Sequence, residues 1–172
     1  MFSGIRKGEL RHLEWDDVDF QNRLLHVRPK DTWRPKTANS VRTIPLCEPA
    51  IGALRMARER AEMRKVKSSL VFPGRKGLLN DIRESLNGAC DRAGIPRIHV
   101  HGLRHTFGSH MGMAGADPFA IMKALGHSDL QMTMHYVSLG KSHIREQVEQ
   151  LNTIPIPKTA FTSSLVSSQC LT

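Results

Sequence analysis

The chain has little cysteine, few aromatic side chains and fewer acidic than basic residues among its 172 positions. Its three cysteines are odd in number and far apart, which excludes a disulfide framework and argues against a cysteine metal site. No apolar run approaches the roughly 18 residues that a membrane helix requires. We therefore expect no membrane association and a cytoplasmic location. The sequence also has a single tyrosine, Tyr136, so any chemistry that needs a phenol must use it.

The charge of the chain is strongly positive. Lys and Arg number 25 against 16 Asp and Glu, which gives a formal net charge of +9. The basic residues recur along most of the chain and do not collect in one tail. This balance favours a polyanionic partner, most simply nucleic acid. A basic protein with a solvated charged face explains the composition equally well, so charge alone leaves both interpretations open.

The spacing of apolar residues predicts a mainly α (α+β) fold with one small three-stranded antiparallel sheet. Strands are expected at 23–29 and 41–46, with a third beginning at Leu70. The positions of the expected helices are 7–13, 48–66, 81–93, 102–114, 118–125, 130–136 and 141–151. These elements fit one domain over residues 1–152. Residues 153–172 lack periodicity and are expected to form a flexible tail.

The segment HVHGLRHTFGSH, residues 99–110, places four histidines and an arginine at the start of one expected helix. The buried stripe of this helix is expected to be apolar and to consist of Leu103, Phe107, Met111 and Ala114. His101 and Arg104 are three residues apart and share the neighbouring face. Backbone N–H groups and the helix dipole favour an anion at this end, so a phosphate is the expected ligand.

A metal site is the alternative interpretation of these histidines. His101 and His105 are four residues apart, as in helical zinc sites. The segment lacks the intervening glutamate of those sites and a convincing third ligand, and Arg104 would repel a cation. We therefore expect neither a metal nor another cofactor.

Three other motifs accompany HGLRH along the chain: SGIRKGEL from Ser3, KTANSVRTIPL from Lys36, and ALGHSDLQMTMHY ending at Tyr136. Together the four stretches resemble the catalytic domain of the tyrosine recombinases, the phage integrase family of site-specific DNA recombinases. The resemblance covers approximately residues 2–140. Each motif alone is a weak signal, whereas the order arginine, hairpin lysine, HxxR, LGH and tyrosine is highly specific.

The resemblance implies a set of catalytic residues. In chain order they are Arg6, Lys36, His101, Arg104, His127 and Tyr136, with Glu9 as the supporting acidic residue. The family's lysine lies in the turn of a β-hairpin ahead of a strand resembling RTIPL. Lys36 matches that place, and Lys30 is the reserve because the register of this loop is uncertain from sequence.

The residue types suit phosphodiester chemistry. Two arginines supply fixed forks of donors for the nonbridging oxygens, where charge develops in the transition state. By the family's mechanism, Tyr136 attacks phosphorus, forms a 3′-phosphotyrosyl enzyme and releases a 5′-hydroxyl. A lysine is a suitable acid for that leaving oxygen, and His101 can help to move the tyrosine's proton. The covalent link stores the bond energy, so a second 5′-hydroxyl can reverse the step without ATP or metal.

The resemblance also implies double-stranded DNA as partner and a homotetramer assembled on it. The expected helix at 141–151 has a narrow apolar stripe of Ile144, Val148 and Leu151, which we expect to dock on a neighbouring protomer. Packing in cis, as a terminal core helix, is the open alternative. Truncation after Gly140 distinguishes the two, because only cis packing predicts a loss of domain stability.

Family members normally have further helices ahead of the first arginine, preceded by a separate domain that clamps DNA. Both are lacking ahead of Arg6, so a catalytic domain truncated at its N-terminal side is expected. Two functions stay open on this basis. The chain is either a DNA breaking and rejoining enzyme or a catalytically inactive DNA-binding or assembly remnant of one.

Overall fold

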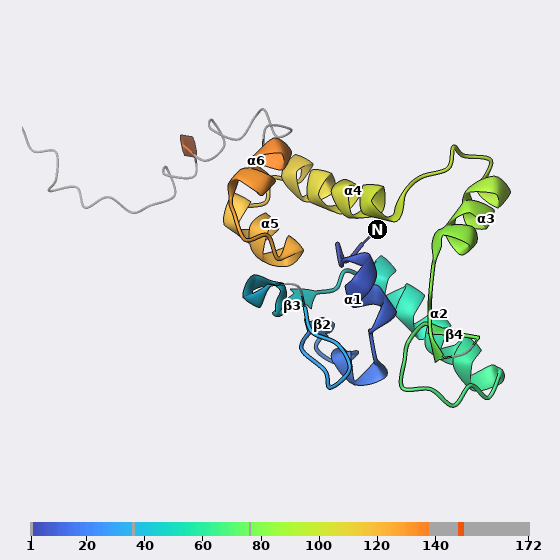
Figure 1. The fold of residues 1–172 in the computed structure, drawn as a ribbon. Coiled ribbons are helices and arrows are strands. Elements are labelled where there is room, and N and C mark those ends of the chain that lie inside the picture. Colours follow the sequence, from blue (N-terminus) through green and yellow to red (C-terminus); the bar gives the residue numbers. More distant parts are fainter. Residues whose placement is uncertain (1, 36, 76, 138–147, 150–172) are drawn as a thin grey trace, which may run out of the picture. The chain divides into compact units, whose positions relative to one another are not determined.

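The structure, a computed structural model, describes residues 2–35, 37–75, 77–137 and 148–149 (Figure 1). Residues Met1–Gly140 form one compact unit, and Lys141–Thr172 form a second. The helices are α1 (Lys7–Arg11), α2 (Glu48–Met63), α3 (Arg83–Ala93), α4 (Val100–Met113), α5 (Pro118–Leu125) and α6 (Gln131–Val137), with 3₁₀ turns at Trp15–Asp17 and Ala38–Ser40. The strands are β1 (Val18–Asp19), β2 (Leu24–Val27), β3 (Arg42–Pro45), β4 (Pro73–Gly74) and β5 (Gly77–Leu78).

The mainly α architecture with one small three-stranded sheet confirms the expected fold class. Strand order is β1-β2-β3 and both pairings are antiparallel. The register places Leu25 opposite Val18 on one side and opposite Ile44 on the other, and all three side chains are buried. They pack with Ile51 and Leu54 of α2 in a single apolar cluster. This cluster supports β3, which begins at Arg42.

The predicted third strand was wrong in position. The sheet's third strand is β1, because the Asp19 carboxylate accepts the backbone N–H groups of Gln21 and Asn22 and so closes a tight turn back into β2. Leu70 makes only an isolated bridge to Glu14. The residues that follow it pair instead in a separate two-stranded sheet of β4 and β5.

The predicted helices within the described residues are confirmed, with ends that differ by a few residues. α5 keeps its predicted bounds because Asp117 caps it, accepting the Ala120 N–H, and Pro118 opens its first turn. The helix expected at 141–151 lies outside the described residues, except that 148–149 are helical. The tail at 153–172 lies outside them entirely.

The second apolar cluster lies among α4, α5 and α6. Ile121, Leu125 and Tyr136 form its buried centre, with Phe107 and Met111 partly buried against them. These three helices contact one another pairwise, and in Figure 1 the yellow α4 lies beside the orange α5 and α6. Just ahead of α1, the side chains of Phe107 and Leu125 lie against Gly4, and Ile5 packs on the first cluster.

The predicted buried stripe of α4 was only partly right. Ala114 is exposed, and the side chains of Leu103, Phe107 and Met111 are only partly buried. The buried residues of α4 are instead Arg104, Gly108 and Gly112, spaced four apart. Apolarity did not identify this face because a guanidinium and two glycines carry it.

Among the described helices, none combines the length and apolarity needed to cross a membrane.

Candidate active site

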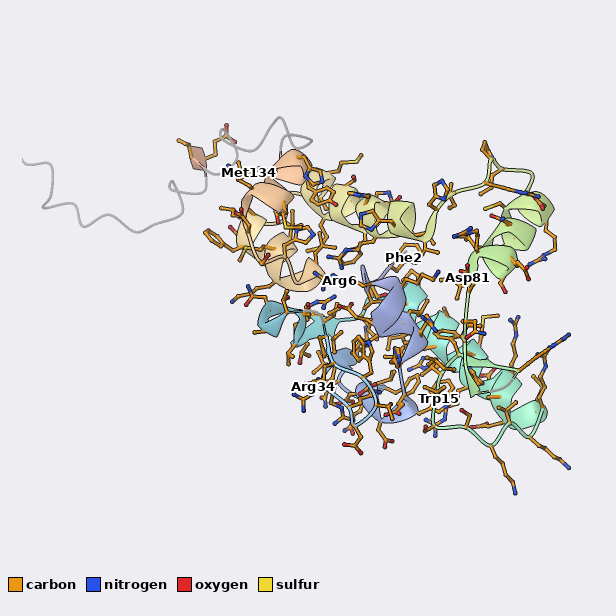
Figure 2. All side chains as sticks on the ribbon, viewed as in Figure 1. Phe2, Arg6, Trp15, Arg34, Asp81 and Met134 are labelled. Carbon is orange, nitrogen blue, oxygen red and sulfur yellow. The ribbon has the colours of Figure 1, made fainter. Side chains whose placement is uncertain are left out.

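A cleft of about 600 Å³ runs between the start of α1 and the helices α4 and α6. Five of the residues predicted from the sequence line it: Arg6, His101, Arg104, His127 and Tyr136. Glu9 is buried beside Arg6, and Lys36 lies outside the described residues. Residues that are 130 positions apart in sequence therefore meet at one surface. In Figure 2 the labelled Arg6 side chain marks the α1 side of this place.

Glu9 holds two guanidinium groups at once. Its carboxylate accepts Arg6 Nη1 at 2.9 Å and the Arg6 backbone N–H at 2.7 Å. On its other side it accepts Arg42 Nη1 and Nη2, both at 3.0 Å. Burial raises the pKa of Glu9, but the hydrogen bonds and charge of Arg42 and the bonds from Arg6 outweigh it and lower the net value. The carboxylate is thus a fixed anion between two cations.

Three arginines from distant segments close the C-terminal end of α5. Arg42 Nε donates to the Ala124 carbonyl at 2.8 Å, and Arg6 Nη2 donates to the Gly126 carbonyl at 2.5 Å. Arg104 Nη2 donates to Leu125 at 2.5 Å. The last carbonyls of a helix lack partners within it and carry partial negative charge. The guanidinium groups satisfy both needs, and each is thereby oriented.

The backbone conformation explains the glycine of the LGH motif. Gly126 ends α5 in the left-handed conformation, with φ of 64°, which glycine adopts without strain. A Cβ atom there would lie 2.9 Å from Arg42 Nη1 and 3.0 Å from the Asn39 carbonyl. Leu125 before it is fully buried, and His127 after it turns into the cleft. Any larger residue at 126 would displace the arginine that holds Glu9.

Arg104 is the buried cation of the site, 6% exposed. Its Nη1 donates to the Gly4 carbonyl at 2.6 Å and its Nη2 to Leu125. Burial lowers the pKa of Arg104 to about 10, with further lowering by Arg6 and Arg42, while Glu9 opposes them. The group therefore stays charged at neutral pH, and two of its five N–H donors fix its plane.

His127 is buried, and its ring is oriented by a threonine. Its Nδ1 lies 2.9 Å from Thr133 Oγ1, and Thr133 itself is fully buried in α6. Burial lowers the pKa of His127 to about 4, and the charges of Arg104 and Arg6 add to this effect. The imidazole is therefore neutral at pH 7.

Tyr136 lies in α6 with 2% of its surface exposed. Its hydroxyl is 2.6 Å from Nδ1 of His105. The His135 ring is 3.8 Å from the tyrosine ring between centroids, and the His127 ring stacks at 6.4 Å with 19° between planes. Burial raises the pKa of Tyr136, and the positive charge of Arg104 acts in the opposite direction. The phenol is thus surrounded by imidazoles.

Two glycines of α4 form the surface on which Tyr136 rests. A Cβ at Gly108 would lie 2.7 Å from Cζ of the tyrosine ring, and a Cβ at Gly112 would overlap the Tyr136 carbonyl oxygen. Separations of this size are far below the 3.5–4.0 Å or so at which carbon atoms pack. The glycines therefore allow α6 to approach α4 closely enough to bring the phenol to the cleft.

Lys30, the reserve lysine, is engaged in a structural ion-pair network. Its Nζ lies 2.5 Å from Asp17 Oδ2 and 2.8 Å from Glu14 Oε2, with 13% of the side chain exposed. Two carboxylates hold this ammonium group, which supports Lys36 over Lys30 as the hairpin lysine. Lys36 stays a prediction.

The histidines of the cleft are poorly arranged to bind a metal ion. Within the described part of the chain, no three His, Cys, Asp or Glu side chains are grouped so as to hold a metal ion. The rings of His101 and His105 lie edge to face with centroids 4.5 Å apart, and Arg104 follows His101 by one turn of α4.

Sequence reasoning missed several residues of this site. Arg42 stands in the RTIPL strand like any strand-end cation, and nothing local marks it as the partner of Glu9. Thr133 is one polar residue among several in α6. Gly108 offered a signal, since glycine inside a helix is unfavourable and indicates close packing of another element.

The chain is similar to known proteins. Residues 1–143 match the Phage integrase family. The prophage integrase IntR of Escherichia coli K12 is 31% identical over 182 aligned residues, covering 88% of this chain and 44% of that protein. The tyrosine recombinase XerC of Mycobacterium leprae is 34% identical over 150 aligned residues, covering 83% of this chain and 48% of that protein. The chain thus spans less than half the length of these relatives.

Solved structures share the fold. The crystal structure of XerA recombinase aligns with a TM-score of 0.67 and 27% identity, covering 87% of this chain and 54% of that one. The catalytic domain of bacteriophage HP1 integrase aligns with a TM-score of 0.56 and 27% identity, covering 86% and 74%. The family match over most of the chain and the shared fold lead to one conclusion: this chain belongs to the phage integrase family of tyrosine recombinases.

Proposed function

We propose that the chain is the catalytic domain of a site-specific DNA recombinase or integrase, which cleaves and rejoins double-stranded DNA through a 3′-phosphotyrosyl intermediate at Tyr136. The observation that carries this proposal is the cleft itself. One phenol, two guanidinium groups and two histidines of the predicted set line it together. Related proteins solved as DNA complexes, such as the XerH recombinase bound to its difH substrate, support DNA as the partner.

The geometry supports a role for each of these residues. Arg6 and Arg104 bind the nonbridging oxygens of the scissile phosphate, with orientations already set by the carbonyls at the end of α5. His127 donates a hydrogen bond from Nε2, since Thr133 occupies the other ring nitrogen. Glu9 keeps Arg6 in place.

The leaving 5′-oxygen needs a proton, and we assign Lys36, in the loop between β2 and β3, as the general acid that donates it. Its neighbour Thr37 bonds Ser40 at 2.9 Å, and Ser40 accepts Arg6 Nη1 at 3.1 Å. The described end of this loop therefore reaches the first arginine. His101, on the cleft wall, is assigned to assist proton movement.

The burial of Tyr136 indicates that attack requires a movement of α6 or a widening of the cleft when DNA binds. We propose that assembly of several protomers on DNA causes this movement. A homotetramer on DNA, docked through the helix at 141–151, would couple the position of α6 to a neighbouring protomer. We assign residues 1–152 to the catalytic domain and 153–172 to a flexible tail of a cytoplasmic protein.

A nicked suicide substrate tests the function. After attack on such DNA the short fragment that carries the released 5′-hydroxyl diffuses away. The covalent protein–DNA adduct therefore accumulates and is seen on a denaturing gel. The unaltered chain is expected to form this adduct, and Tyr136→Phe is expected to abolish it while DNA affinity stays within about a factor of two to three, since the phenol makes no large contribution to phosphate contacts.

The outcomes separate the two functions left open by the sequence. An adduct with the unaltered chain excludes the inactive remnant. DNA binding without any adduct supports the remnant, and an adduct that persists in Tyr136→Phe contradicts the choice of nucleophile.

A further inference from the structure

The hydroxyl of Tyr136 is paired with a histidine outside the set that the family resemblance implies. His105 follows Arg104 directly on α4, and its Nδ1 lies 2.6 Å from the phenol oxygen. The rings are tilted by 47° with centroids 5.9 Å apart. His105 itself is exposed and lines the cleft, whereas the phenol beside it is buried. A proton on the phenol therefore has an acceptor within hydrogen-bond distance that leads toward solvent.

The other histidines of the cleft are oriented differently. His127 uses Nδ1 for Thr133. His101 packs edge to face on His105, with centroids 4.5 Å apart, and so lies one ring further from the phenol. The His135 ring is tilted by 47° against the tyrosine ring, with 3.8 Å between centroids. The geometry thus favours His105 as the group that meets the phenol proton.

We propose that His105 accepts the proton of Tyr136 as the phenol becomes the nucleophile, an inference that rests on the proposed function. The phenol O–H bond breaks while the oxygen–phosphorus bond forms, and the proton moves to Nδ1, which gives an imidazolium. The bond from phosphorus to the 5′-oxygen breaks, and that oxygen leaves with a proton from the assigned general acid. On rejoining, the imidazolium returns its proton to the departing phenol.

The electrostatic surroundings keep His105 ready to accept. Burial lowers the pKa of His105, and the neighbouring His101, His135 and Arg104 lower it further. At neutral pH the ring is therefore neutral, with the proton on Nε2 and the lone pair of Nδ1 toward the phenol. The titratable and charged groups that line the cleft with it are His101 and Arg104 on α4, His127 after α5, His135 and Tyr136 on α6, and Arg6 and Lys7 across the cleft.

Two substitutions of His105 distinguish a role as proton acceptor from a role as the hydrogen-bond partner that positions the phenol. His105→Ala removes both functions. Asparagine keeps an acceptor oxygen near the position of Nδ1 but takes no proton at neutral pH. His110→Ala is the matched control, because His110 is an exposed residue of the same helix and does not line the cleft. Circular dichroism and DNA affinity establish that each variant folds and binds.

Single-turnover adduct formation is then measured against pH. For the unaltered chain and His110→Ala, we expect the rate of adduct formation to rise with pH as His105 loses its proton and then to become constant. Both His105 variants should lose about 10²–10⁴-fold at neutral pH, the usual contribution of a general base. The rate of adduct formation by these variants should continue to rise with pH, because hydroxide then acts as the base. The difference in rate from the unaltered chain should therefore decrease at high pH.

Two results would overturn the proposal. Full activity of His105→Asn would mean that His105 only positions the phenol. A faster His105→Ala would mean that the contact restrains Tyr136 before DNA binds.

A titration without cleavage separates this proposal from the proposed function. The imidazole pKa of His105, followed by NMR, should rise in Tyr136→Phe, because a donated hydrogen bond stabilises the neutral ring. An unchanged value contradicts the contact whatever the cleavage result. If the titration shows the contact but the unaltered chain forms no adduct, the proposed function fails, and the proton transfer fails with it.

Discussion

Replacing Gly108 by alanine should displace the nucleophile while leaving the fold intact. The added Cβ would lie 2.7 Å from Tyr136 Cζ and 2.9 Å from both Cε atoms. Carbon atoms pack at roughly 3.5–4.0 Å, so the ring must withdraw by about 1 Å. Tyr136 is 2% exposed and packs with Ile121 and Leu125, so the ring can move only together with α6.

The magnitude separates an effect on stability from an effect on rate. Overpacking a core costs about 1–3 kcal/mol. Replacing glycine by alanine inside a helix stabilises the helix by about 1 kcal/mol. The free energy of unfolding should therefore fall by no more than about 2 kcal/mol. A misplacement of about 1 Å, by contrast, can cost on the order of 10²-fold in rate.

Denaturant unfolding and single-turnover adduct formation measure the two effects separately. Gly52→Ala is the matched control, because Gly52 lies inside α2 and a Cβ there meets nothing within 4 Å. It should gain stability and keep its rate. If Gly108→Ala forms adduct at the unaltered rate, the glycine surface does not determine the position of the phenol.

Three further predictions address charge. Arg42→Ala should lower the free energy of unfolding by about 3 kcal/mol, since it leaves the buried Glu9 carboxylate with one partner, whereas the exposed Arg58→Ala should cost less than about 1 kcal/mol. Burial lowers the pKa of His127 to about 4 in the folded chain, against 6.5 for an unperturbed histidine, so the free energy of unfolding should fall as pH drops from about 6.5 toward 4. Denaturant unfolding of His127→Gln should show a shallower fall over that pH range. EDTA should leave adduct formation unchanged and added zinc should not raise it, because arginines supply the positive charge; activity lost on chelation and restored by zinc would indicate a metal site.

The sequence predicted the elements with strong local signals. α5 begins at an Asp-Pro cap and ends at a glycine, and its bounds were right. The third strand was wrong because the turn decides which segments pair. Asp19 binds the backbone of a four-residue reversal that leads directly into β2, whereas the residues after Leu70 pair with Gly77–Leu78 in a separate sheet.

The predicted site residues came from motifs, and motifs do not show which side chains meet. The pairing of Arg42 with Glu9 joins residues 33 positions apart, and that of Tyr136 with His105 joins residues 31 apart. Neither pair has a spacing that follows from helix or strand geometry. The contact of Tyr136 with His105 depends on how α4 and α6 pack, which in turn depends on two glycines that apolar periodicity does not register.

The end of α5 explains how a site made of mutually repelling cations is kept together. Arg6, Arg42 and Arg104 each donate to one of three consecutive carbonyls at 124–126. Partial negative charge at a helix C-terminus and the single carboxylate of Glu9 offset the repulsion. Arg104 also spans to the Gly4 carbonyl, a bridge of two nitrogens that a lysine, with one, cannot make. The same bonds that complete the helix therefore fix the charges that the scissile phosphate would meet.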